Sequence, residues 1–260
     1  MSPSAVADIR AWFDGYVAPY RDTDPEGLRN IDLKIAHTHR VCEMAEALCD
    51  GEQLSPDERR IAVVSALLHD VGRFPQYRRW RTFRDSESDN HARLSVEVIR
   101  EAGVLDRFGE GERLLIEEAV RFHNLLDLPE RFQSPTTLFI RLIRDADKLD
   151  IWRVFLDQDS RSGDERASAA NLGLPDEPGL TPACREALQE GRVVRLDECI
   201  ILNDFKLLQM SWALDLNFRT SFMIVRERRY LPLLAATMNS PGDVAGCLET
   251  LMAEVERRAA

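Results

Sequence analysis

The chain has 260 residues, of which 44% are hydrophobic and 30% are charged, and its formal net charge at pH 7 is −11. This is enough for one large globular domain, or for one domain with an appendage. The acidic balance argues against binding to nucleic acid or to an anionic membrane surface through a global positive field. A small anionic substrate stays possible, because a metal ion or a local cluster of cations reverses the field inside a pocket.

The five cysteines are odd in number and form no C-x-x-C pair, so no disulfide framework is expected. The simplest location is a reducing cytoplasm. Residues 1–17 carry no basic segment followed by a long apolar one, and they predict an amphipathic helix rather than a signal peptide. No window approaches the length of a membrane span, so we expect no membrane partner.

Helical periodicity dominates along the chain, and neither a strand with alternating apolar and polar residues nor an internal repeat is evident. The predicted class is all-α. Helices are expected over residues 33–49, 58–70, 90–102, 111–123 and 136–156, with a cap in Ser88-Asp89-Asn90. A long connection is expected over 72–90.

The segment 157–182 is rich in Gly, Pro, Asp and Ser, and it predicts a surface insertion. Residues 183–237 return to a helical pattern, and a short last helix is expected from Gly242. We therefore expect a helical core over 1–156 and C-terminal helices over 183–260 packed on that core.

The candidate functional residues are histidines and aspartates at the ends or on the inward faces of predicted helices. Asp147 is the clearest, because it interrupts an apolar stripe with isoleucines at offsets −7, −4 and +4, and a buried carboxylate needs a cation. His123 shares a face with Leu115 and Ala119. His69 and Asp70 end an apolar run, so they are also expected to be buried polar groups that need a partner. The set is His37, His69, Asp70, His91, His123 and Asp147.

Helices that each contribute one inward ligand are how bundles build metal sites. Six groups exceed one tetrahedral site and suit two divalent ions, with Asp70 as a bridge. The structural alternatives are a capping or core role for each histidine, and pairing of Asp147 with Arg144. His39 lies two residues from His37, about 200° around a helix, so both cannot face one site.

Three motifs in this order resemble the HD-domain superfamily of metal-dependent phosphohydrolases: "HTHRV" from His37, "LLHDVGRF" with His69 and Asp70, and "RDADKLD" with Asp147. His91 and His123 match the extra histidines of binuclear members. The resemblance covers about Ile31 to Phe155 and implies an HD-type helical bundle. "FHNLLDLPERF" lacks the double histidine and the G-Y-P triplet of the HD-GYP subfamily, so cyclic dinucleotide cleavage of that type is not implied. The part beyond Phe155 resembles uncharacterised bacterial proteins of the HD-[IV]-G-R-F type.

The resemblance implies a phosphomonoesterase or phosphodiesterase that holds one or two ions of Mn, Fe, Zn, Ni, Co or Mg and acts on a small phosphorylated or nucleotide-like substrate. Candidate catalytic residues are Asp70, Arg73 and Lys148. The segment 73–84 carries five arginines and four aromatic residues but no acid. It predicts either a phosphate-binding collar or a solvated loop whose aromatic residues dock on the core. Two other functions stay open: a diiron oxygenase of the same superfamily, and a regulatory metal-binding module without catalysis.

Overall fold

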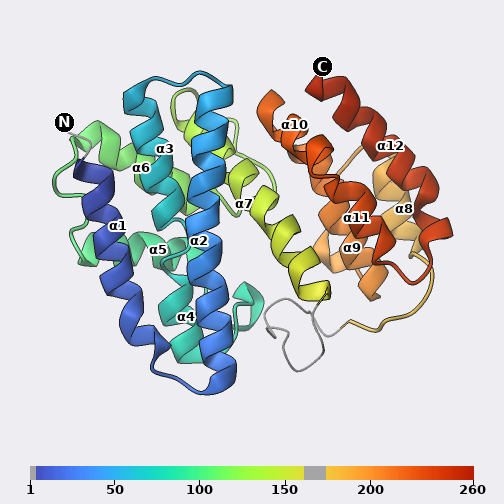
Figure 1. Ribbon diagram of the computed structural model, residues 1–260, viewed down its shortest axis with the longest axis horizontal. Helices are drawn as coiled ribbons and strands as arrows, with labels where there is room; N and C mark the ends of the chain where they lie inside the picture. Colours follow the sequence, from blue (N-terminus) through green and yellow to red (C-terminus); the bar gives the residue numbers. More distant parts are fainter. Residues whose placement is uncertain (1–3, 161–173) are drawn as a thin grey trace. The chain divides into compact units, whose positions relative to one another are not determined.

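The computed structural model describes residues 4–160 and 174–260, and within them every regular element is an α-helix or a 3₁₀ helix (Figure 1). The predicted all-α class is therefore confirmed. The described residues divide into two compact units, 4–150 and 151–160 together with 174–260. The boundary falls inside one long helix, α7 (Thr136–Asp159). Residues 161–173, half of the predicted insertion 157–182, lie outside the described residues.

The first unit contains the helices that the periodicity predicts, together with one that it does not. They are α1 (Ser4–Val17), α2 (Pro25–Gly51), α3 (Pro56–Leu68), α4 (Arg73–Trp80), α5 (His91–Glu101), α6 (Glu110–Phe122) and the start of α7, with 3₁₀ turns η1 (Ala18–Arg21) and η2 (Asp85–Glu87). Helix α2 begins eight residues earlier than expected. Its start is fixed by Asp24, which accepts the N–H of Gly27 at 2.8 Å, and by Pro25 at the first helical position, where no donor is needed.

Helix α3 is the centre of this unit. A capping box between Ser55 and Glu58 starts it, and every residue from Ile61 to Leu68 is buried. Its neighbours are α1, α2 and α6 (Figure 1). A helix that is surrounded in this way carries the residues after its C-terminus into the interior, and these residues are His69 and Asp70.

The expected connection over 72–90 is corrected by helix α4. Pro75 does not prevent this helix, because it lies in the first turn, where backbone N–H groups have no partner inside the helix. Phe74 and Tyr77 are one turn apart and are 0% and 4% exposed, so their burial stabilises the helix against the core.

The second unit holds the end of α7 and the C-terminal helices. They are α8 (Pro182–Gln189), η5 (Leu196–Glu198), α9 (Leu202–Ser211), η6 (Trp212–Asp215), α10 (Arg219–Glu227), α11 (Tyr230–Ala236) and α12 (Pro241–Ala259). The expected return to helix over 183–237 is confirmed, but the expectation of a short last helix is wrong. Helix α12 has 19 residues, because buried side chains recur along it from Val244 through Leu251 to Val255.

Candidate metal centre

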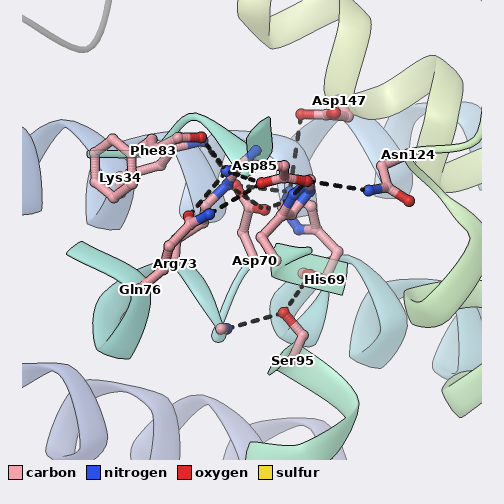
Figure 2. A network of polar contacts seen from close by, with 12 residues as sticks. Lys34, His69, Asp70, Arg73, Gln76, Phe83, Asp85, Ser95, Asn124 and Asp147 are labelled. Atoms are coloured by element: carbon pink, nitrogen blue, oxygen red, sulfur yellow. Dashed lines mark hydrogen bonds and ion pairs between the residues drawn. The ribbon is translucent and has the colours of Figure 1, made fainter. Parts of the chain in front are cut away.

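The turn after α3 is fixed directly against the first turn of α5. A Cβ on Gly72 would lie 2.4 Å from the Ser95 nitrogen and 2.5 Å from the His91 carbonyl oxygen, so only glycine fits. The Ser95 hydroxyl accepts the Gly72 N–H at 2.9 Å and donates to the His69 carbonyl at 2.8 Å (Figure 2). These contacts hold the end of α3 and the start of α5 in one arrangement.

Four buried histidines of the first unit present the same ring edge to one another. Each gives its Nδ1 hydrogen to an oxygen acceptor: the carbonyls of Ala66 for His69 (2.6 Å) and Val120 for His123 (2.7 Å), and the carboxylates of Asp150 for His37 (2.7 Å) and Asp85 for His91 (2.7 Å). Carbonyls and ionised carboxylates only accept, so each neutral ring keeps its hydrogen on Nδ1. In the neutral form of each ring the Nε2 atom is therefore unprotonated, and it points inward.

These Nε2 atoms meet other acceptors instead of donors. Those of His91 and His123 lie 3.1 Å apart, and His37 Nε2 lies 3.0 Å from Asp147 Oδ1. His69 Nε2 has no hydrogen-bond partner within the described part of the chain. Lone pairs and a carboxylate oxygen at these distances repel one another unless a proton or a metal cation lies between them. The donor set therefore fits a metal ion, because neutral imidazole and carboxylate are metal ligands.

Asp70 lies between two groups of histidines. Its Oδ2 is 3.9 Å from His37 Nε2 and 3.6 Å from His69 Nε2, and its Oδ1 is 3.6 Å from His91 Nε2. Three sets of ligand atoms each lie within 4.8 Å of one another: His37, His69 and Asp70; Asp70, His91 and His123; and His69, His123 and Asp147. The structure thus brings all six residues singled out in the sequence into one cluster, and Asp70 belongs to two of the sets.

Burial holds most of these histidines in the neutral form. It lowers the pKa of His91 and of His123 to about 4, and it also lowers the pKa of His69. His37 differs: burial and Lys34 lower its pKa, but its two aspartate neighbours outweigh them and raise the pKa overall. Three of the four rings are therefore neutral, and ready to bind an ion, well below pH 7.

The two carboxylates of the cluster stay ionised although burial opposes it. Lys34 is the strongest of the charges that hold the pKa of Asp70 well below its usual range. For Asp147, whose side chain is 20% exposed, the hydrogen bond with His37 is the main cause of a lowered pKa. Both groups are therefore anionic at neutral pH and need compensating positive charge.

Two cations of the protein reach Asp70. Lys34 Nζ is 2.7 Å from its Oδ2, and Arg73 Nε is 3.4 Å from its Oδ1 (Figure 2). The other end of Arg73 is occupied, since Nη1 donates to the Phe83 carbonyl at 2.5 Å and to Asp85 Oδ1 at 3.0 Å. Arg73 therefore connects Asp70 to Asp85, the acceptor of His91. A direct contact between Arg73 and substrate stays a prediction.

Three residues of this centre were missed in the sequence. Lys34 precedes His37 by three residues, and Asp150 follows Asp147 by three, so helical spacing placed each on the face of a candidate ligand. That signal was available. Asp85 lies in the 3₁₀ turn η2, where no periodicity marks a residue as inward-facing.

The arginine-rich segment 73–84 is used mainly for docking. Phe74 and Tyr77 are buried, and Arg78 and Arg81 donate to oxygens of the connection between α1 and α2 at 2.7 and 3.0 Å. These contacts favour the interpretation in which the aromatic residues dock on the core.

The remaining candidates lie apart from the three ligand sets. His39 is 3.5 Å from Asp14 and packs against the edge of Phe13, so its separation from the cluster agrees with the helical geometry. Lys148 is half-buried on α7 beside Asp147, and its catalytic role stays a prediction.

Residues 35–152 match the family model of the HD domain, and this range contains all six clustered residues. These residues therefore form an HD domain, as the motifs indicate. The members of this family are mostly metal-dependent hydrolases. No curated protein and no solved structure matches the chain. Within the described residues, none of the helices has the length and apolar character to span a membrane.

Proposed function

We propose that the protein is a metal-dependent phosphohydrolase that uses two divalent ions and acts on a small phosphorylated or nucleotide-like substrate. The observation that carries this proposal is the convergence of imidazole Nε2 atoms on two sides of Asp70. One ion would be held by His37, His69, Asp70 and Asp147, and the other by Asp70, His91 and His123. Asp70 would be the shared ligand.

Two bound divalent ions would lower the pKa of a water molecule and screen the negative charge of a phosphoryl group. The chain itself supplies the positions of the ligands. The hydrogen bonds at the four Nδ1 atoms set the tautomer and the orientation of each ring before any ion binds. Lys34, whose side chain is 18% exposed, adds positive charge beside Asp70 and so favours an anionic substrate.

Phosphoester chemistry follows from this arrangement more directly than other hydrolysis. Two ions that share a carboxylate clamp the attacking and leaving oxygens of a displacement at phosphorus. A nucleotide-like substrate is the narrower part of the proposal, and its support is the resemblance to the HD superfamily. The resemblance to proteins of the HD-[IV]-G-R-F type does not identify a substrate.

The first test is the metal content of protein purified without chelator, measured by elemental mass spectrometry. We expect about two Mn, Zn, Ni, Co or Fe per chain. The double variant His69→Ala/Asp70→Ala should lose both ions, because it removes ligands from every proposed set. His39→Ala is the control, since this histidine lies on α2 with His37 but outside the sets, and it should keep the metal.

The second test is hydrolysis of chromogenic phosphomonoesters and phosphodiesters, followed by a panel of nucleotides. Activity that depends on added Mn²⁺ and is absent from the double variant would support the proposal. Two irons per chain with an air-sensitive spectrum, and no hydrolysis, would replace it by the oxygenase. A metal-free protein whose fold is unchanged in the double variant would refute the metal centre itself.

A further inference from the structure

Two cysteines of the second unit face each other. Cys184 is in the first turn of α8, and Cys199 directly follows the 3₁₀ turn η5. The Cys184 thiol donates to the carbonyl oxygen of Glu198, the residue before Cys199, at 3.5 Å, and the Cys199 thiol donates to the carbonyl oxygen of Arg195 at 3.5 Å. The two thiols are close enough to shift the pKa of each other. Both thiols are free in this structure.

The other cysteines have no such neighbour. Cys42 and Cys49 are seven residues apart on α2, which separates them by about 10 Å along the helix axis, beyond the reach of a disulfide. For Cys247, burial raises the pKa of the thiol, and among the described residues no other thiol contributes to this shift. The close pair is therefore a particular feature of the second unit and does not result from a high cysteine content.

We propose that Cys184 and Cys199 form a reversible disulfide when the protein meets a peroxide. One thiolate attacks a peroxide oxygen, the O–O bond breaks, and a sulfenic acid and hydroxide form. The second thiolate attacks the sulfenic sulfur, the S–O bond breaks, and the S–S bond forms. The two thiol protons convert the two departing hydroxides to water, so two thiols and one hydrogen peroxide give one disulfide and two waters.

The surroundings favour one order of these steps. Cys199 is the main cause of the lowered pKa of Cys184, whereas the pKa of Cys199 itself is raised, which favours Cys184 as the attacking thiolate. Cys184 is fully buried, whereas Cys199 is partly exposed and gives peroxide access to the pair. In a reducing compartment such a bond is transient, as is typical of a redox-sensing pair and not of a structural one.

The disulfide would join the start of α8 to the end of η5 and close the segment between them. This segment already has internal contacts, because the side chain of Arg192 binds that of Glu198 at 2.7 Å. The cross-link would therefore restrict a piece of chain that is ordered in the reduced protein, without a large rearrangement.

The experiment treats the full-length reduced protein with hydrogen peroxide and measures intact mass, followed by peptide mapping without reductant. We expect a loss of 2 Da, one cross-linked pair of tryptic peptides that carry Cys184 and Cys199, and full reversal by dithiothreitol. The oxidised protein should melt about 5 °C or more above the reduced protein.

Cys184→Ser and Cys199→Ser should each abolish the loss of 2 Da, and Cys247→Ser is the matched control that should keep it. Alkylation of the reduced wild-type protein gives a second readout that needs no variant: both thiols should become protected after peroxide treatment. A disulfide that involves Cys247, or oxidation of Cys184 to the sulfinic acid with Cys199 still free, would overturn the proposal. Either result is independent of the metal centre.

Discussion

Removal of the Ser95 hydroxyl tests how the centre is built. Ser95 is 0% exposed, and its hydroxyl makes two hydrogen bonds, of 2.9 Å with the Gly72 N–H and of 2.8 Å with the His69 carbonyl. Ser95→Ala leaves a buried donor and a buried acceptor without partners. Each loss costs about 1–3 kcal/mol, so we expect the free energy of unfolding to fall by about 2–6 kcal/mol.

Ser65 provides a matched control on α3. It is also 0% exposed, but its hydroxyl has no hydrogen-bond partner within the described residues. Ser65→Ala therefore removes the same atom at equal burial without breaking a hydrogen bond, and it should change stability by less than about 0.5 kcal/mol.

The assay is urea unfolding of the metal-free protein, combined with hydrogen exchange at the Gly72 amide. Ser95→Ala should lower the urea midpoint and speed exchange at this amide, whereas Ser65→Ala should do neither. Affinity for Mn²⁺, measured by calorimetry, should also fall about tenfold in Ser95→Ala, because His69 and His91 are no longer held in fixed positions relative to each other. Equal unfolding free energies for the two variants would refute the reasoning.

Three further predictions concern the charges of the centre. Lys34→Met should raise Mn²⁺ affinity about tenfold in calorimetry, because Lys34 competes for Asp70, while Lys34→Arg should leave it nearly unchanged; weaker binding in Lys34→Met would contradict this. Asp150→Asn should weaken Mn²⁺ binding about 10- to 100-fold, because it replaces the anionic acceptor that orients His37 by a neutral amide, and unchanged affinity would count against that role. The metal-free protein should lose stability as the pH falls from about 6.5 to about 4: the pKa of the buried His91 is about 4, so the unfolded chain binds the proton first, which costs up to about 3 kcal/mol. A urea midpoint that stays constant between pH 7 and pH 5 would disprove this last prediction.

The helices could be predicted from the sequence because their signals are local. The apolar run before His69 and the cap at Asn90 each lie within a few residues of the element that they define. Helix α4 was missed because it is only eight residues long, has Pro75 in its first turn, and buries only some of its side chains. A segment this short depends on the core against which it packs, and periodicity alone does not reveal that core.

For the candidate site, the sequence predicted which residues come together but not how they are held. A histidine or aspartate that interrupts an apolar face indicates an inward-facing polar group, and this identified the six clustered residues. The same logic could have found Lys34 and Asp150. Asp85 and the linking contacts of Arg73 could not be predicted, because they depend on how a turn without periodicity folds back over the centre.

The hydrogen bonds at the four Nδ1 atoms have a further consequence for how the proposed metal centre would acquire its ions. Their acceptors all belong to the chain itself, so the ring orientations need no group from outside the chain. In the proposed centre, ions would then bind to a folded site instead of driving folding, in contrast to small zinc domains that collapse without their ion. A chelator should strip such a protein without unfolding it. The identity of the bound metal would then follow the supply of ions around the mature protein, and one polypeptide could carry different metals under different growth conditions.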